Sequence, residues 1–241
     1  MVYFIRMGTL FIVSTPIGNL EDISLRALGI LFSSEIIASE DTRRTWTLLS
    51  ELRKRFPLLT TSQHEPKLIR YDDRTERTTT PELIELLTQG TSMALVTDAG
   101  TPLISDPGFV LVREARKRSI PVTSVPGPSS PIAALSVSGL PADKFLFLGY
   151  YPEKQSHRKR LLESLTSFAF PVTVIFFAAP HKLIEDLEDM LAVFGDCQIT
   201  ITRELTKMHE EVWKGTISES ISHFSDPKGE FVLLFDTRDI I

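Results

Sequence analysis

The stretch LVTDAGTPLISDPG, residues 95–108, joins the end of a short apolar run to a loop of glycine, proline and small hydroxyl residues. The run itself, MALVT (93–97), has the length and apolar character of a buried strand. Glycine allows positive φ and a close approach of backbone to a ligand, whereas proline stiffens the loop. The stretch therefore predicts a buried strand that ends in a rigid loop.

Two further loops of this composition also follow predicted strands. STPIGN (14–19) follows LFIVS (10–14), and PGPSSP (126–131) follows PVTSV (121–125). In an open parallel sheet, ligands bind beyond the carboxyl ends of the strands, where such loops converge. Gly and Pro also occur in ordinary turns, but three such loops at one edge favour a small-molecule site.

Apolar runs alternate with amphipathic stretches through the first part of the chain. This alternation is typical of βαβ units, and it predicts a mostly parallel sheet with helices on both faces. Further strand candidates are EIIAS (35–39) and FLFLG (145–149). The polar stretch 52–80 is expected to contain one short strand.

The second part of the chain is predicted to be a separate α/β domain. We place the boundary after Gly149, in the polar stretch YYPEKQSHRKR, so that the domains comprise residues 1–149 and 150–241. Two strand candidates, QITITR (198–203) and EEVWKG (210–215), follow one another without a helix, which implies an antiparallel pair and a mixed sheet. The other predicted elements are helices at 156–167, 180–194 and 216–224 and strands at 172–177 and 230–235.

Composition limits the class of protein. A chain of 241 residues with 42% hydrophobic content can build a sizeable core. The single cysteine, Cys197, cannot form an internal disulfide, so a reducing, cytoplasmic location is expected. No apolar run approaches the roughly 20 residues that span a bilayer, and the five histidines are scattered, so neither a membrane nor a metal partner is expected. The motifs of P-loop and Rossmann nucleotide sites are absent.

Charge gives a mixed indication about nucleic acid. The formal net charge of −5 argues against broad electrostatic binding to phosphates. A local patch remains open, and the strongest candidate is KQSHRKR (154–160), where Lys154, Arg158 and Lys159 could contact phosphates together with Arg203. Taken singly, a run of this kind is more often a solvated helix face.

Five ordered blocks at compatible spacing cover nearly the whole chain: STPIGNLEDISLRAL (14–28), ASEDTRRT (38–45), LVTDAGTPLISDPG (95–108), VPGPSSPIAALSVSGLP (125–141) and RELTKMHEEVWKG (203–215). In these blocks the sequence resembles the tetrapyrrole methylase superfamily of S-adenosylmethionine-dependent enzymes. The resemblance is to the branch that methylates the ribose 2′-hydroxyl of a cytidine in the decoding region of small-subunit (16S) ribosomal RNA.

The resemblance implies two unequal α/β domains, a homodimer, S-adenosylmethionine in a cleft between the domains, and small-subunit ribosomal RNA as the partner. The cofactor residues that it implies are Pro16, Gly18, Asp98, Gly100, Thr101, Pro102, Ile104, Ser129, Ser130, Ala178 and Ala179. Asp98 could orient a cofactor amine, or it could cap its own loop through backbone amides.

The sequence departs from the branch in two places. Where members often have Tyr-Glu-Ser-Pro-His-Arg, the chain has FFAAPHK (176–182), without the acidic residue. Members commonly continue past the last strand, whereas the sequence ends at DTRDII, so any docking role of that segment is expected to fall to other residues.

A ribose hydroxyl is a weak nucleophile, so a positioned base, or a cation that stabilises the forming alkoxide, should add roughly 10² to 10⁴ in rate. The candidates are Glu40, Asp41 and Arg43 in one block and Lys207, beside Arg203 and Glu204, in another. For both blocks, an internal salt-bridge network is an equally weighted alternative. Two other functions also stay open, namely methylation of a tetrapyrrole or other small molecule and a non-catalytic cofactor-binding module.

Overall fold

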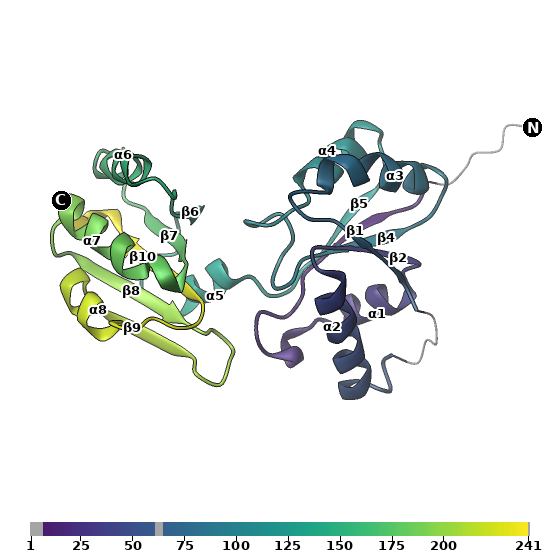
Figure 1. Ribbon diagram of the computed structural model, residues 1–241, viewed down its shortest axis with the longest axis horizontal. Coiled ribbons are helices and arrows are strands. Elements are labelled where there is room, and N and C mark those ends of the chain that lie inside the picture. Colours follow the sequence, from purple (N-terminus) through teal and green to yellow (C-terminus); the bar gives the residue numbers. More distant parts are fainter. Residues whose placement is uncertain (1–6, 61–64, 241) are drawn as a thin grey trace, which may run out of the picture. The chain divides into compact units, whose positions relative to one another are not determined.

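The chain divides into two compact units between Ser129 and Ser130, which we call unit 1 and unit 2 (Figure 1). The computed structural model describes residues 7–60 and 65–240. The division lies earlier than the boundary expected after Gly149. The reason is that strand β6, Phe145–Tyr150, pairs in parallel with β7, Thr173–Ala178, and so belongs to the second sheet rather than the first.

Unit 1 contains a five-stranded sheet in the order β3-β2-β4-β1-β5. Every pair in it is parallel, which confirms the predicted parallel sheet. Strand β1 has β4 and β5 as its neighbours, so the loops that follow these three strands emerge side by side. The strands are β1 Leu10–Val13, β2 Ile36–Ser39, β3 Lys67–Arg70, β4 Met93–Val96 and β5 Val122–Val125.

Helices cover both faces of this sheet (Figure 1). Ile36 and Ala38 of β2 pack in one core with helices α3 and α4, whereas Ile37 packs in another core with α1 and α2. This alternation arises because successive side chains of a strand point to opposite faces. The helices are α1 Leu25–Ser33, α2 Thr42–Arg55, α3 Glu76–Thr88 and α4 Phe109–Lys117, with a 3-10 turn at Leu20–Asp22.

Unit 2 contains a second five-stranded sheet in the order β6-β7-β10-β8-β9. Only β6 and β7 are parallel, and the other pairs are antiparallel, so the predicted mixed sheet is confirmed, as is the β8–β9 antiparallel pair. The remaining strands are β8 Gln198–Arg203, β9 Glu211–Thr216 and β10 Phe231–Asp236.

One large apolar cluster forms the core of unit 2. It joins side chains of β7, β8 and β10 to those of the helices, and the free thiol of Cys197 is buried in it. The helices are α5 Ser130–Val137, α6 Gln155–Thr166, α7 Leu183–Phe194 and α8 Ile217–His223, with 3-10 turns at Pro180–Lys182 and Thr237–Ile240. No helix in the described ranges is long and apolar enough to cross a membrane.

Helices α6 and α7 are joined by a buried ion cluster around Arg158. The Arg158 side chain is 1% exposed, and its Nε donates to Asp189 at 2.7 Å while a terminal nitrogen pairs with Glu185. Asp186 lies 3.7 Å from the same guanidinium and is also buried. A guanidinium that is buried and paired in this way is held inside unit 2, so the expected phosphate-binding role of Arg158 is corrected to a structural one.

Replacing Arg158 with alanine should leave the carboxylates of Asp186 and Asp189 buried without their counter-charge. We expect the free energy of unfolding at pH 7 to fall by about 3 to 5 kcal/mol, measured by chemical denaturation. Burial already raises the pKa of Asp186 to about 6. Because protonation removes the uncompensated charge, the loss should shrink below that pH and grow above it.

The matched control for this variant is Lys159→Ala, the exposed neighbour on the same helix. Its effect on stability should stay within about 0.5 kcal/mol at every pH. Equal losses for the two variants, or a loss independent of pH, would contradict the structural role of Arg158.

Candidate active site

Hydrogen bonds tie together the three Gly- and Pro-rich loops at the carboxyl edge of the first sheet. Thr15 and Gly100 form an antiparallel bridge, with N–H to carbonyl distances of 2.8 and 3.1 Å. The hydroxyl of Thr101 lies 2.9 Å from that of Ser14 and donates to the carbonyl of Pro128 at 2.9 Å. The structure thus brings the predicted loops into one connected group.

The second loop contains unusual backbone conformations. Gly100 has φ +87°, and the non-glycine residues Leu103 and Ser105 have φ of 74° and 65°. Positive φ at residues with a Cβ is disfavoured and is found mainly where the surrounding structure enforces it, often at functional sites. A Cβ added at Gly100 would lie 3.4 Å from the side chain of Ile17 and 3.9 Å from the carbonyl of Pro128, between the other two loops.

The predicted cofactor residues divide between the two units. Those in the three loops of unit 1 lie in the connected group, with Pro16, Gly100 and Pro102 buried and Gly18 and Ile104 exposed. The others lie in unit 2: Ser130 begins α5, Ala178 ends β7 and Ala179 follows it. The cofactor role of all these residues stays a prediction.

Three acidic residues of adjoining segments interact at the same edge. The Glu40 carboxylate lies 3.4 Å from the backbone nitrogen of Asp98, and Asp98 in turn accepts from the backbone nitrogen of Asp41 at 3.2 Å. The guanidinium of Arg44 donates to the second Asp98 oxygen at 2.9 Å. These contacts fasten the loop to the start of α2. They correspond to neither of the two roles left open for Asp98, which stay predictions.

The ASEDTRRT block contains both a helix cap and a carboxylate, Glu40, that has no ion-pair partner among the described residues. Asp41 caps α2 by accepting from the backbone of Arg43 and also pairs with its guanidinium at 2.8 Å, so that these bonds lower the pKa of Asp41. This supports the salt-bridge interpretation for Asp41 and Arg43. Glu40 differs, because burial raises its pKa and the nearby charges of Asp98 and Asp73 raise it further.

Asp106, which the sequence did not single out, is near enough to Glu40 and Asp98 for their charges to raise its pKa. Burial first, and then the charge of Glu40, raise its pKa to about 7, against a smaller opposing effect of a hydrogen bond with Thr97. A carboxyl group with a pKa near neutrality is suited to accept a proton. Its place in SDPG, in the predicted loop and two residues before Gly108, the N-cap of α4, is the sequence signal that could have identified it.

The second predicted catalytic block, RELTK, lies in unit 2 after β8. Lys207 pairs with Glu204 at 2.8 Å and with Glu230 at 3.2 Å, and its pKa is raised, so it is a cation rather than a base at neutral pH. Arg203 pairs with Glu211 at 3.2 Å. These contacts support the salt-bridge alternative for this block.

The remaining basic candidates, Lys154 and Lys159, are exposed at the start of α6 and within it. Their contact with phosphates stays a prediction. A search of the described residues finds no group of three or more side chains that could hold a metal ion.

Comparisons with known proteins agree on the family. Residues 9–220 match the family described as tetrapyrrole (corrin/porphyrin) methylases. A relative from Thermotoga maritima, named ribosomal RNA small subunit methyltransferase I, is 42% identical over 97% of the chain and 100% of its own length. A relative of the same name from Xylella fastidiosa is 46% identical over 94% of the chain and 81% of its own length.

The fold is also found among solved structures. Uroporphyrin-III C-methyltransferase from Thermus thermophilus, in complex with S-adenyl homocysteine, matches 94% of the chain and 97% of its own chain with a TM-score of 0.62 at 14% identity. At that identity the likeness concerns the fold alone. The family match and the two relatives show that the chain belongs to the tetrapyrrole methylase family, in the branch of ribosomal RNA small subunit methyltransferase I.

Proposed function

We propose that the protein transfers a methyl group from S-adenosylmethionine to the ribose 2′-hydroxyl of a cytidine in the decoding region of small-subunit ribosomal RNA. The names of the relatives support the RNA substrate. The observation that carries the proposal is the connected loop group at the carboxyl edge of the first sheet, with Asp106 and Glu40 beside it.

The residues of unit 1 fit such a cofactor. The space that a Cβ at Gly100 would fill lies between the first and third loops, so backbone there is open to close approach. Gly100 would let the cofactor approach the backbone closely, while the hydrogen bonds of Gly100 and Thr101 would keep the loops in place around it. The exposed side chain of Ile104 would supply an apolar contact. Bound S-adenosylmethionine would supply an electrophilic methyl carbon.

Asp106 would act as the general base of the reaction. Its carboxylate would take the proton of the ribose hydroxyl as the oxygen forms its new bond to carbon. Glu40 would act through Asp106, because its negative charge raises the pKa of the Asp106 carboxyl. The hydrogen bond with Thr97 favours the ionised form of Asp106 and so limits the increase in its pKa.

The proposal is tested by transfer of labelled methyl from S-adenosylmethionine to purified small ribosomal subunits that lack the modification. Free small-subunit RNA and a porphyrinoid serve as parallel acceptors. Nuclease digestion and mass spectrometry should find the label on a cytidine 2′-oxygen of the subunit. Label on the porphyrinoid alone would support small-molecule methylation instead, and no label with any acceptor would contradict the enzymatic proposal.

Substituting Gly100 with alanine should weaken cofactor binding. The φ of +87° is unfavourable for alanine by about 1 to 2 kcal/mol, and the new methyl group would occupy space between the loops. We expect the dissociation constant for S-adenosylhomocysteine, measured by titration calorimetry, to rise roughly tenfold. Gly29→Ala is the matched control, because Gly29 lies in α1 with no atom within 4 Å of the added Cβ, and it should keep the wild-type affinity.

Asp106→Asn should abolish methyl transfer while the protein remains folded. Because burial disfavours the ionised Asp106, the neutral amide should leave the melting temperature at pH 8 unchanged or higher. In the wild type, kcat/KM should rise as pH passes the pKa of about 7, where Asp106 becomes ionised. Glu40→Gln removes a charge that raises this pKa, so the increase in kcat/KM should occur at lower pH.

Two results would count against Asp106 as the base. One is an Asp106→Asn variant that loses melting temperature at pH 8 in parallel with activity, since that indicates a structural role. The other is a pH profile that Glu40→Gln leaves in place.

A further inference from the structure

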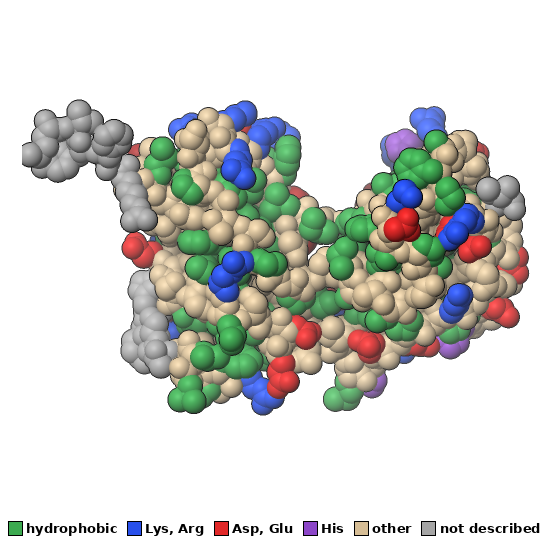
Figure 2. All heavy atoms as spheres, turned by 180° about the vertical axis from the view of Figure 1, so that it is seen from behind, with side chains coloured by type: hydrophobic (Ala, Val, Ile, Leu, Met, Phe, Trp, Pro, Cys, Tyr) green, Lys and Arg blue, Asp and Glu red, His purple; other side chains and the backbone are tan. Residues whose placement is uncertain are grey.

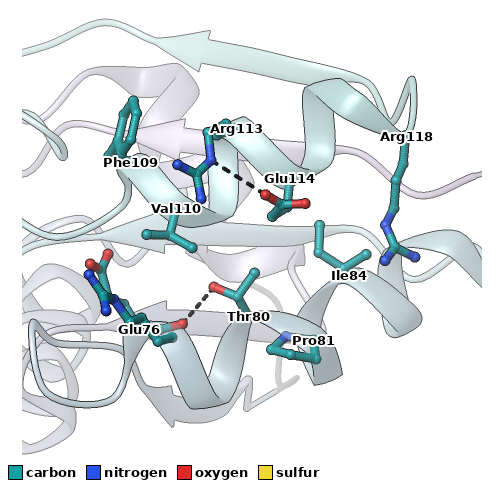
Figure 3. A pocket seen from close by; sticks show the side chains of 10 residues that line it. Glu76, Thr80, Pro81, Ile84, Phe109, Val110, Arg113, Glu114 and Arg118 are labelled. Atoms are coloured by element: carbon teal, nitrogen blue, oxygen red, sulfur yellow. Dashed lines mark hydrogen bonds and ion pairs between the residues drawn. The ribbon is translucent and has the colours of Figure 1, made fainter.

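A pocket of about 480 Å³ lies between helices α3 and α4 of unit 1 (Figure 3). We call it the α3–α4 groove. Apolar side chains of both helices line it, namely Pro81 and Ile84 of α3 and Val110 of α4. Phe109, at the first residue of α4, stands at one end and is 63% exposed.

Three arginines and two glutamates, Glu76 and Glu114, accompany this apolar lining, so cations outnumber acidic residues by one. Arg77 comes from α3, while Arg113 and Arg118 come from α4 and the residue that follows it. Arg113 lies over the ring of Phe109, with 5.3 Å to the centroid, and pairs with Glu114. Among the residues that the structure describes, Arg77 and Arg118 have no ion-pair partner, and both are exposed.

The cations extend beyond the groove. Arg116 and Lys117 occupy the last turn of α4, beside Arg118. Figure 2 shows Lys and Arg side chains gathered at the end of unit 1 where Figure 1 places α3 and α4. Although the whole chain carries a net charge of −5, this part of its surface is locally basic.

The two helices that form the groove are held together by contacts on their buried side. The buried hydroxyl of Tyr71 lies 2.9 Å from that of Thr80 on α3 and accepts from the backbone nitrogen of Leu111 on α4 at 3.1 Å. Both helices also bury apolar side chains in one core. The groove is therefore a rigid feature of the fold, and binding in it would not require the helices to be ordered first.

The groove begins at the same sheet edge as the candidate active site. Helix α4 starts at Phe109, three residues after Asp106 in the sequence, and α3 starts at Glu76, just after β3. The rise of about 1.5 Å per helical residue makes the groove roughly 13 Å long from Phe109 to Arg118. That length matches about four stacked nucleotides at 3.4 Å each.

A second pocket of unit 1 provides a contrast in charge. It lies near the amino ends of β2 and β3, and its lining includes Glu35, Glu65 and Glu82 with only Lys67 as a cation. Phosphates would be repelled there. Among the pockets described, the α3–α4 groove has both the cations and the exposed aromatic ring that single-stranded nucleic acid requires.

We propose that the α3–α4 groove is a docking surface for a single-stranded segment of RNA, with phosphates on Arg77 and Arg118 and a base stacked on Phe109. The inference rests on the proposed function and extends it, because it assigns a place on unit 1 where the RNA is held. The groove would anchor nucleotides that flank the one to be methylated.

The test compares wild type with Arg77→Gln/Arg118→Gln and with Phe109→Ala. Glutamine has a helix propensity similar to that of arginine, and the substitution removes the charge. The primary readout is direct binding of the full chain to purified small ribosomal subunits, measured by co-sedimentation between 50 and 200 mM salt. Methyl transfer to the same subunits is measured in parallel.

The double variant should bind subunits about tenfold more weakly and reduce the slope of log affinity against log salt by roughly 1.4, which corresponds to two lost phosphate contacts on a single strand. Phe109→Ala should weaken binding about tenfold without changing that slope. In methyl transfer, the KM for subunits should rise while kcat and S-adenosylhomocysteine affinity stay at their wild-type values.

The charge control is Lys54→Gln/Lys228→Gln, which removes two exposed cations outside the groove. It should bind subunits like the wild type. If this control and the Arg77/Arg118 variant weaken binding equally, net charge alone explains the effect and the groove proposal is overturned.

Three other outcomes also overturn it. The first is wild-type binding by the Arg77/Arg118 variant, and the second is no binding of subunits by any form of the protein. The third is a change in the sedimentation of the variant protein alone, which would assign the groove to a contact between copies of the chain. Intact binding without any methyl transfer would instead contradict the proposed function and leave the docking surface supported.

Discussion

The arrangement of the candidate site depends on the hydrogen bonds that join its loops. Parallel strands that neighbour one another end at the same edge, and the order β4-β1-β5 places three Gly- and Pro-rich loops side by side. The Thr15–Gly100 bridge and the contacts of Thr101 then turn neighbouring loops into one group. Gly100 makes the bridge possible, because its φ of +87° is rarely adopted by other residues. Without these bonds, each loop would lose conformational entropy when it became ordered around a ligand, and this loss would weaken binding.

The same edge concentrates negative charge at a cost to stability. Asp98 is offset by Arg44 and by the backbone nitrogen of Asp41, and Asp41 by Arg43. Glu40 and Asp106 instead have raised pKa values, because burial and the charges of nearby carboxylates disfavour their ionised forms. Carboxylates that are held near one another without full neutralisation are unfavourable for folding but useful for proton transfer. Leu103 and Ser105 in the same loop also have positive φ, a backbone conformation that costs local stability.

A run of basic residues in the sequence does not show which of their side chains are exposed on the surface. Within KQSHRKR, Arg158 is turned inward and neutralised by acidic residues of α7, while Lys159 beside it is exposed. A helix alternates buried and exposed positions within a few residues, so adjacent cations serve different purposes. Conversely, Arg77 and Arg118 are 41 positions apart and form no run, yet they line one groove because α3 and α4 pack together on one face of the sheet.

The amino-acid sequence was enough to predict most of the elements, the parallel first sheet, the mixed second sheet and the loops where chemistry is expected. It could do so because the local composition of a segment indicates a buried strand or a Gly- and Pro-rich turn. The features that depend on which residues are neighbours in space could be seen only in the tertiary structure. It assigned FLFLG to the second sheet through its pairing with β7, buried Arg158, and brought Asp106 under the influence of Glu40. The physical reason is that strand pairing, burial and electrostatic coupling arise between residues that are distant along the chain, and no local pattern specifies them.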